Sequence, residues 1–504
     1  MKMRCFVMAA AAVSAALALN SCNREQLSPK TGDAQQLTLT VTLPGEAGTR
    51  AVFEENKDAT GKFLGLKTKW ELGDEMSVGM SGSDASTTFK AVSVSEDGKT
   101  AVFSGEVLAE WGELSDGTPF WSCYPSTDMD WRQQDGTLAN LSDYDYLWIY
   151  SDYSGGKLIP NEDKTEREIF LFRFPAGFAF CDESFSGNIT LEISGAMIMS
   201  VSKILDQIPA TGENTIQAGP VAVSEGELTS DVYVAAGCWE NPSQVNIAVI
   251  PSDGSFVKKY QLNHEDGLAP GKLYTITSVE KLDLVAEAEF VDLGLSVKWA
   301  KWNLGATKET DYGDYFAWGE TSGYKSGKTD FSWGTYKWMK EGQSDWKYIT
   351  KYTFADNQTS GIWYDGNTFV GDNGDGEEHK DLASYDYVDD AARAALGGKS
   401  RMPTDEEWTE LREECTWDWR TAEDGYANNG YLVTGPNGKT IFLPAAGDRV
   451  GTGLYYDGSD GYYWSSSLGG SNSDYARRVY FVSGGVTRDS DLRNFGFSVR
   501  PVCD

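Results

Sequence analysis

Alternation of apolar and polar residues with a period of two is the feature that most restricts how this chain can fold. The stretch 36–46, QLTLTVTLPGE, places an apolar residue at every second position over its first eight residues, which is the pattern of a half-buried β-strand. Two similar runs, 89–94 and 100–104, flank an Asp-Gly pair at Gly98, and this arrangement predicts a hairpin. Strand-like runs recur as far as residue 277. We therefore expect a mainly β chain.

Composition indicates the number of domains and excludes one class of partner. The 504 residues include 54 glycines and only 15 prolines, which suits a β-rich globular protein, and the length predicts about three domains. The formal net charge is −33. Because proteins that bind nucleic acid neutralise phosphates with a basic surface, we expect no nucleic-acid partner.

The first residues predict export. Two basic residues precede an apolar run over residues 6–19, and the segment ends LNSC at Cys22. A charged start and a short apolar core are typical of a signal peptide, here residues 1–21. The last four residues resemble the lipobox of bacterial lipoproteins, which implies cleavage before Cys22, diacylation of its thiol, and a tether over residues 22–36. An ordinary signal peptide followed by a spare cysteine is the alternative.

Cysteine and histidine usage argues against a metal site. Once the signal peptide and the lipidation site are set aside, five cysteines remain: Cys123, Cys181, Cys238, Cys415 and Cys503. An odd number in an exported chain means that at least one is unpaired. None lies in a C-x-x-C arrangement, and the sequence has only two histidines. We therefore expect no zinc, no haem and no other cofactor.

Several motifs in the N-terminal half resemble, in the same order, those of the fimbrillin-like proteins of anaerobic gut bacteria. They are the lipobox, a Thr-Arg loop at Arg50, KTKWELGDEMSV (67–78), FRFPAGFAF (172–180) and LAPGKLYTI (268–276). The resemblance implies two transthyretin-like β-sandwiches, over residues 37–166 and 167–282. For pilins it also implies proteolytic processing after an arginine, here Arg50, and assembly by strand donation. An exposed loop arginine without that role is the alternative.

The region from residue 287 onward is richer in tryptophan and glycine and contains helix signals. A capping box begins at Thr404, and Trp408, Leu411 and Cys415 follow at helical spacing on one face, which predicts a helix. A shorter helix is expected over residues 389–396, because two aspartates stand at its N-terminal end.

Seven blocks in this region resemble the Fibrobacter succinogenes major paralogous (FISUMP) domain. They are VDLGLSVKWAKWNLGA (291–306), YGDYFAWGE (312–320), DDAA (389–392), RMPTDEEW (401–408), FLPAAG (442–447), YYWSSS (462–467) and GFSVRPV (496–502). The resemblance implies an α+β, C-type-lectin-like domain over residues 287–504, a fold shared with formylglycine-generating enzymes and with target proteins of diversity-generating retroelements. It also implies a disulfide between Cys415 and Cys503.

In the retroelement targets, ligand-contacting residues lie between the blocks FLPAAG and SVRPV. The ligand-binding residues implied here are Asp448, Arg449, Thr452, Leu454, Tyr455, Tyr456, Asp457, Tyr462, Tyr463, Asp474, Tyr475, Arg477, Arg478, Tyr480, Thr487, Arg488, Asp489, Asp491, Leu492 and Arg493. The composition of the stretch favours recognition, and simple decoration of loops is the alternative. Because strand residues alternate faces, we expect about half of these to face a ligand. Trp464 and the serines 465–467 are expected in the core.

Enzymatic functions have weaker support. Formylglycine-generating relatives depend on paired active-site cysteines, whereas the two in this domain are assigned to a disulfide. The acidic run 372–378 misses the spacing of a calcium loop and predicts a solvated loop. Carboxylate pairs arise by chance in so acidic a chain, and two histidines offer no Ser-His-Asp set. We assign no catalytic residue.

The sequence thus predicts a lipid-anchored adhesin of the outer membrane and cell surface, in which two β-sandwiches present a lectin-like domain. The expected ligand is an extracellular protein or glycan. Pilus subunits are further expected partners if the chain is a pilus tip. The alternatives are a fixed structural pilus subunit or anchor and an extracellular carbohydrate-active or other enzyme. No later segment reaches the roughly 20 apolar residues of a membrane helix.

Overall fold

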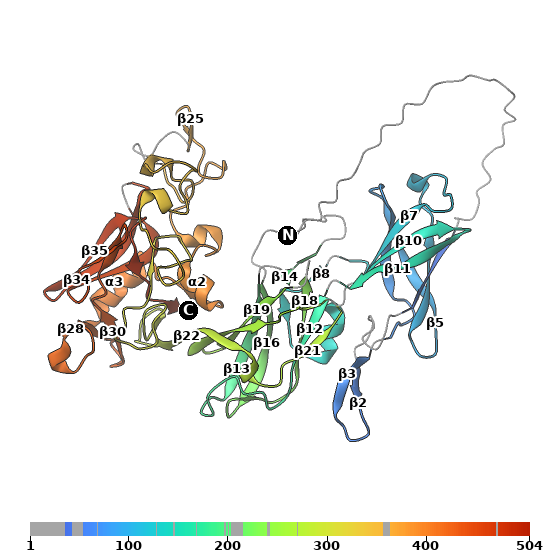
Figure 1. The fold of residues 1–504 in the computed structure, drawn as a ribbon, viewed down its shortest axis with the longest axis horizontal. Coiled ribbons are helices and arrows are strands. Elements are labelled where there is room, and N and C mark those ends of the chain that lie inside the picture. The colour runs from blue at the N-terminus through green and yellow to red at the C-terminus, as the bar shows by residue number, and fades with distance from the viewer. Residues whose placement is uncertain are drawn as a thin grey trace.

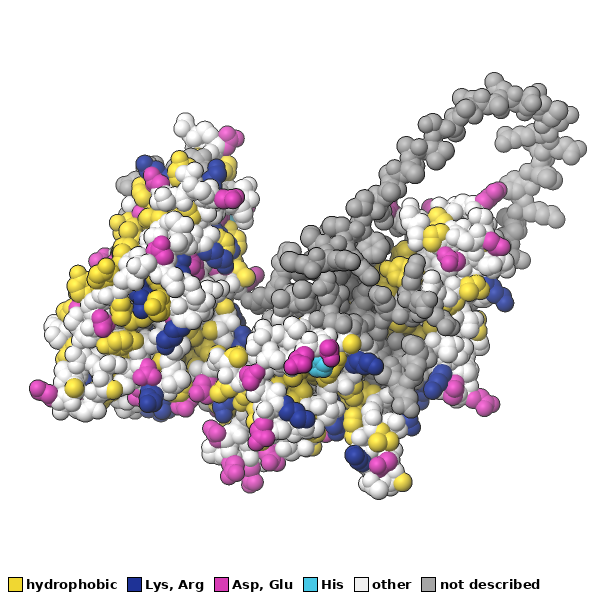
Figure 2. All heavy atoms as spheres, in the orientation of Figure 1, with side chains coloured by type: hydrophobic (Ala, Val, Ile, Leu, Met, Phe, Trp, Pro, Cys, Tyr) yellow, Lys and Arg dark blue, Asp and Glu magenta, His cyan; other side chains and the backbone are white. Residues whose placement is uncertain are grey.

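Three β-rich units follow one another along the chain (Figure 1). The computed structural model describes residues 36–42, 54–67, 69–127, 129–144, 147–167, 169–195, 198–199, 201–202, 215–238, 242–269, 271–355, 363–469 and 472–504. Within these ranges no helix is both long and apolar enough to cross a membrane. On the face seen in Figure 2, basic side chains lie singly among acidic ones. The prediction of a mainly β, multidomain chain is confirmed.

The first unit is a closed seven-stranded barrel. Its strands, in pairing order, are β1 (Gln36–Thr42), β11 (Lys157–Arg167), β10 (Leu147–Ser154), β7 (Pro119–Tyr124), β4 (Glu75–Met80), β5 (Ser86–Val94) and β6 (Thr100–Glu106). Leu37, Leu39 and Val41 of β1 are buried, as the alternation predicts, and the β5–β6 hairpin is confirmed. The sequence predicts a β-sandwich for this unit, but β1 pairs with both β6 and β11 and so closes the sheet into a barrel.

Two segments before residue 167 belong to the core of the second unit. Their elements are β2 (Glu54–Lys57), β3 (Phe63–Lys67), β8 (Met129–Asp130), β9 (Gln133–Gln134) and α1 (Leu138–Leu141). Leu66 and Trp131 lie in that core, and the guanidinium of Arg173 lies 3.9 Å from the ring centre of Phe63. Some residues before position 166 therefore pack with the second unit and not with the first.

The second unit packs two sheets around one core. The smaller sheet runs β14 (Ile198–Met199), β18 (Val232–Cys238), β12 (Ile169–Phe174), β21 (Leu273–Thr275). The larger begins β17 (Glu227–Leu228), β16 (Thr215–Ser224), β13 (Gly187–Ser194), β19 (Gln244–Pro251), β20 (Phe256–Asn263), while β9 pairs with β16 and β15 (Val201–Ser202) with β8. Every residue of β12 is buried, and its phenylalanines share a core with the isoleucines of β13. This arrangement is that of a β-sandwich.

Strand β22 (Asp283–Val291) carries the larger sheet into the C-terminal unit. Six of its first seven residues pair with β20, with an irregularity at Val285, and its last two pair with β23 (Lys298–Ala300). The sheet then continues through β37 (Val502–Cys503) to β27 (Ser400–Arg401). The segment that joins the two units along the chain is therefore a strand of both.

The C-terminal unit combines small sheets with two helices. One sheet contains, in pairing order, β24 (Tyr315–Phe316), β36 (Phe497–Ser498), β33 (Asp460–Leu468), β34 (Tyr475–Val482) and β35 (Gly485–Leu492). A second contains β28 (Thr416–Arg420), β29 (Gly430–Thr434) and β30 (Thr440–Pro444). Two strand pairs complete the unit: β31 (Asp448–Val450) with β32 (Gly453–Tyr455), and β25 (Tyr364–Asp365) with β26 (Thr368–Phe369). The helices are α2 (Ala391–Leu396) and α3 (Asp405–Glu414). Single-turn 3₁₀ helices along the chain cover Ala109–Trp111, Ser142–Tyr144, Val279–Lys281, Trp333–Thr335, Trp346–Tyr348, Leu382–Tyr385 and Ala422–Asp424.

Both predicted helices are present. The capping box of α3 forms as expected: the Glu407 amide donates to the Thr404 hydroxyl at 3.1 Å, and the Thr404 amide donates to the Glu407 carboxylate at 2.8 Å. Trp408 and Leu411 are buried. Asp390 caps α2 by accepting from the amides of Ala392 and Arg393.

The contribution of residues 129–144 to the second core is testable by substitution. Trp131 is fully buried, and its indole donates to the Tyr144 carbonyl at 2.9 Å. Trp131→Ala is expected to destabilise the protein by about 3 to 5 kcal/mol, because it leaves a cavity in the core. Urea unfolding followed by circular dichroism measures the loss. Tyr150→Ala, at a residue 43% exposed, is the aromatic control and is expected to cost little; equal midpoints for the two variants would contradict this packing.

Candidate binding face

The strands β33, β34 and β35 separate the candidate ligand-binding residues onto two faces. In the antiparallel register, Tyr462 lies opposite Tyr480, Tyr480 opposite Thr487, and Arg478 opposite Asp489. Residues directly opposite each other in such a pair project from the same face. These residues, with Asp460 and Asp491, form what we call the β33–β35 face. The other side of the same sheet carries Tyr463, Val479 and Phe481, which pack in a core with Trp408 of α3.

Arg478 lies at the centre of the β33–β35 face. Its Nε donates to the Asp491 carboxylate at 3.0 Å, and its guanidinium carbon lies 5.2 Å from the ring centre of Tyr462 and 5.1 Å from that of Tyr480. The two tyrosine rings are 5.0 Å apart. Nη1 of Arg478 has no hydrogen-bond partner among the described residues. The side chain is only 11% exposed, so it is fixed by contacts on several sides, and its Nη1 is both buried and, within the described chain, unpaired.

Asp460 belongs to this face although the sequence argument did not select it. Its carboxylate accepts a hydrogen bond from the Tyr480 hydroxyl at 2.9 Å. Burial raises the pKa of Tyr480, and the bond to Asp460 adds to the rise. Alternation could have identified Asp460, because it stands two residues before Tyr462 in the same strand.

Asp448 adds a buried carboxyl group beside the face. Gly447 precedes it at a φ of +67°, and a Cβ there would lie 2.1 Å from the Tyr455 carbonyl oxygen, so only glycine fits this turn. Asp448 is 7% exposed, and its Oδ1 has no hydrogen-bond partner within the described ranges. Burial, followed by the charges of Asp491 and Asp460, raises the pKa of Asp448 to about 6, although Arg478 acts in the opposite sense.

The β31–β32 hairpin exposes two aromatic side chains. Tyr455 and Tyr456 are 50% and 61% exposed, and their ring centres lie 6.4 Å apart. The amide of Asp460 donates to the Tyr456 carbonyl at 3.0 Å, which holds the end of the hairpin against β33. Thr452 and Asp457 are exposed on the same hairpin. Exposed tyrosines of this kind provide large contact area with a polar tip.

Four candidates are buried structural residues instead. Arg493 is fully buried and donates to the Tyr336 hydroxyl and to three backbone carbonyls. Tyr463 is fully buried, and its hydroxyl donates to the Pro444 carbonyl at 2.7 Å. The guanidinium of Arg449, 9% exposed, lies 3.3 Å from the ring centre of Tyr324. Asp474 is only 4% exposed.

The remaining candidates point away from the face. Arg477 and Arg488 lie 3.6 and 3.4 Å from the carboxylate of Asp405 on α3. Tyr475 and Leu492, which are paired with each other, project from that same side of the sheet because they are two residues from Arg477 and Ser490. Leu454 is half-buried against a separate aromatic cluster. About half of the candidates thus lie on the β33–β35 face or on the adjoining hairpin.

The structure corrects the implied disulfide. Cys415 and Cys503 are both free thiols. Cys415 packs in the same core as Val502, whereas Cys503, the next residue of β37, packs in another. Because successive strand residues point to opposite faces, Cys503 is directed away from Cys415. Burial, with the nearby charges of Glu410 and Glu414, raises the pKa of the Cys415 thiol to about 11.

Two further expectations can be compared with the structure. Trp464, Ser465 and Ser466 are buried as expected, although they lie in strand β33 and not in a loop, and Ser467 is only half-buried. The acidic run 372–378 is not wholly solvated, because the buried carboxylate of Asp372 accepts from the Tyr352 amide at 2.6 Å and from the Tyr385 hydroxyl at 2.7 Å. In the described part of the chain, no group of three or more His, Cys, Asp or Glu residues is arranged to hold a metal ion.

Comparison with known proteins gives only a distant likeness. No protein-family model matches the chain, and no curated protein matches it. A "putative adhesin" from Bacteroides ovatus is 9% identical and covers 51% of this chain and 93% of its own, with a TM-score of 0.26. A "putative cell adhesion protein" from Bacteroides eggerthii is 10% identical and covers 49% of this chain and 86% of its own, with a TM-score of 0.25. A fimbrial assembly protein from Parabacteroides distasonis is 9% identical and covers 51% of this chain and 93% of its own, with a TM-score of 0.24. TM-scores of this size establish neither a family nor a function for this chain.

The raised pKa of Asp448 predicts a pH-dependent effect of its removal. A carboxyl whose pKa is higher in the fold than in the unfolded chain favours folding as it is protonated, so its ionised form destabilises the fold above about pH 6. Asp448→Asn is expected to raise the stability by about 2 kcal/mol at about pH 7.5, with the gain disappearing near pH 4. Thermal unfolding of both proteins between about pH 4 and pH 7.5 measures this gain in stability. Asp457→Asn, at an exposed position, is the control; a gain for Asp448→Asn that did not depend on pH would contradict the assignment.

Proposed function

We propose that this chain is a cell-surface adhesin whose C-terminal unit binds an extracellular protein or glycan through the β33–β35 face and the β31–β32 hairpin. The observation that carries the proposal is the position of Arg478, which lies between Tyr462 and Tyr480 beside Asp491 and has an Nη1 without a hydrogen-bond partner in the described chain. Arg and Tyr are the side chains that most often dominate the energy of recognition.

The rigidity of the face supports this role. Arg478 is already ordered by a carboxylate and two rings, so little side-chain entropy is lost when a ligand binds. The face also offers acceptors, because Asp491 and Asp489 lie 3.0 and 3.9 Å from the guanidinium and Asp460 accepts from the Tyr480 hydroxyl. Tyr455 and Tyr456 extend the surface with exposed aromatic area. A polar, aromatic surface of this composition suits either a protein epitope or a glycan.

The further parts of the proposal rest on the sequence. We infer a C-type-lectin-like fold for residues 287–504 from the FISUMP-like blocks, and a lipid anchor in the outer membrane from the lipobox-like ending at Cys22. Cys22 and Arg50 lie outside the described residues. The β-rich units before residue 283 would hold the binding face away from the membrane.

The binding role of Arg478 can be tested with a matched arginine on the other side of the same sheet. Arg478→Ala is expected to weaken binding at least about tenfold, because both the cation and its aromatic contacts are lost. Arg488→Ala, which removes an arginine that faces α3, is expected to change binding little. Adhesion to cultured cells and binding to glycan and extracellular-protein arrays measure both variants, with thermal unfolding as a check of the fold. Equal losses for the two variants would overturn the assignment.

A pilus role has support from one structural observation. Strand β1 lies between β6 and β11 of the barrel, and Leu37, Leu39 and Val41 fill its core side. Cleavage after Arg50 would separate β1 from the rest of the chain. We propose that β1 is then exchanged for a strand of another subunit, which would find a groove with free backbone groups on both sides.

Processing at Arg50 makes a distinct prediction. Three buried apolar side chains contribute about 5 to 8 kcal/mol to holding β1 in place, so exchange requires that the connecting chain is cut. Arg50→Ala is expected to leave the chain uncut and absent from sheared surface fibres, while it remains on the cell. Arg24→Ala, in the expected tether, is the control. Mass spectrometry of fibres decides the matter: fibres that contain the chain joined through residue 50 would contradict the proposal.

A further inference from the structure

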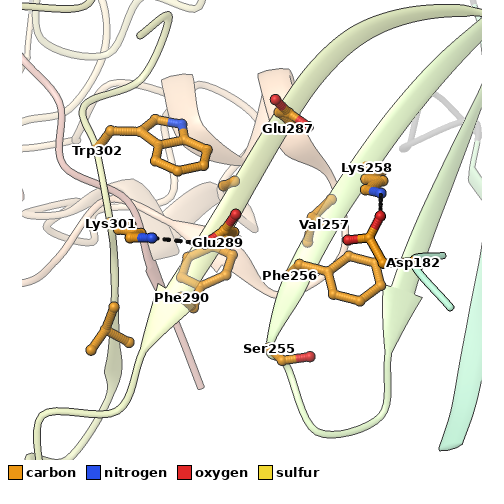
Figure 3. A pocket seen from close by; sticks show the side chains of 12 residues that line it. Asp182, Ser255, Phe256, Val257, Lys258, Glu287, Glu289, Phe290, Lys301 and Trp302 are labelled. Atoms are coloured by element: carbon orange, nitrogen blue, oxygen red, sulfur yellow. Dashed lines mark hydrogen bonds and ion pairs between the residues drawn. The ribbon is translucent and has the colours of Figure 1, made fainter. Parts of the chain in front are cut away.

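A pocket of about 570 Å³ lies where the second and C-terminal units share strand β22 (Figure 3). Its walls come from the start of β20, the second half of β22 and the residues that follow β23, with Asp182 at one side. A volume of this size is in the range of pockets that bind small molecules. None of its lining residues belongs to the β33–β35 face.

Aromatic side chains line this pocket. They are Phe256, Phe290 and Trp302. Figure 3 shows the indole of Trp302 extending from the segment after β23 toward β22. Trp302 is 8% exposed, and its Nε1 is one of the buried donors without a hydrogen-bond partner in the described chain. The pocket therefore has aromatic side chains in its walls, and the indole N–H of Trp302 is buried and unpaired among the described residues.

Both lysines of the pocket are already paired with carboxylates. Lys301 lies 3.3 Å from the carboxylate of Glu289, and Lys258 lies 3.8 Å from that of Asp182. Glu287 stands directly opposite Lys258 in the register of β20 and β22. An anion would have to displace a carboxylate from one of these lysines, and a cation at Glu289 or Asp182 would have to displace a lysine. A hydroxyl group does not have to displace either partner, because it can donate to a carboxylate and accept from an ammonium group.

We propose that this junction pocket binds a sugar unit of a neutral oligosaccharide. The ring would lie against Trp302 and Phe256, with its hydroxyls bonded to Glu287, Glu289 and the two lysines. Aromatic walls with a few converging polar groups are the usual construction of a small-molecule site. This site goes beyond the proposed function, because it lies on other elements than Arg478 and would hold a glycan whether or not the β33–β35 face does.

The experiment uses the full mature chain and named probes. Tetrasaccharides of galactose, mannose and N-acetylglucosamine are titrated separately, and saturation-transfer NMR and tryptophan fluorescence report binding. At least one is expected to bind. Trp302→Ala is expected to weaken that binding at least about tenfold, and Glu287→Gln, at an exposed position where a fold defect is not expected, by about threefold to tenfold.

Two controls separate this site from the binding face and from a peptide site. Arg478→Ala is expected to leave tetrasaccharide binding unchanged, so failure of either site is seen independently of the other. A tetralysine and a tetraglutamate peptide are expected not to bind. The inference would be overturned if no tetrasaccharide bound, if binding survived both Trp302→Ala and Glu287→Gln, or if a charged peptide bound in a manner sensitive to these substitutions.

Discussion

The pairing of one strand with two units is the constraint on which the rest of this structure depends. Strand β22 pairs along β20 for most of its length and then along β23 at its end. Relative motion of the second and C-terminal units would break this ladder and expose its backbone groups, and such groups are costly to leave unpaired when buried. Side-chain contacts reinforce the ladder: the Gly398 amide donates to Glu192 at 3.1 Å, and the Lys259 ammonium group donates to the Ala394 carbonyl at 2.9 Å. The C-terminal unit is therefore presented at a fixed angle.

The C-terminal unit is also fixed internally, which holds the proposed β33–β35 binding face in place. The last strand, β37, lies in the shared sheet, and Arg500 just before it is fully buried and donates to Asn303 and to the Ala300 and Phe442 carbonyls. Arg493 similarly joins several loops through backbone carbonyls. Buried arginines whose donors are satisfied hold irregular segments in one arrangement. The sheet that carries Arg478 packs directly against the shared sheet, because Val479 and Phe481 lie in one core with Trp299 and Val502.

The sequence predicted those features that depend on local pattern and missed those that depend on tertiary pairing. Alternation located β1 and the β5–β6 hairpin, and the capping box located α3. It could not show that β1 closes a barrel or that β22 belongs to two units, because a strand has the same pattern whatever its neighbours are. Arg493 was expected at a ligand because it lies between the blocks FLPAAG and SVRPV, yet it is fully buried and each guanidinium nitrogen donates to a partner inside the protein. For Arg477 and Arg478, a period of two predicted opposite faces but not which face is covered by α3.

Adjacent residues on opposite sides of one strand offer the most direct measurement of the central claim, that the β33–β35 face is the surface that recognises a ligand. Thr487 projects from that face, whereas Arg488 projects toward α3. A photo-crosslinking amino acid is placed at one position or the other in the full chain, which is then irradiated on intact target cells. Our account predicts covalent capture of a cell-surface molecule from position 487 and little from position 488. Equal capture from both positions, or capture from 488 alone, would contradict it.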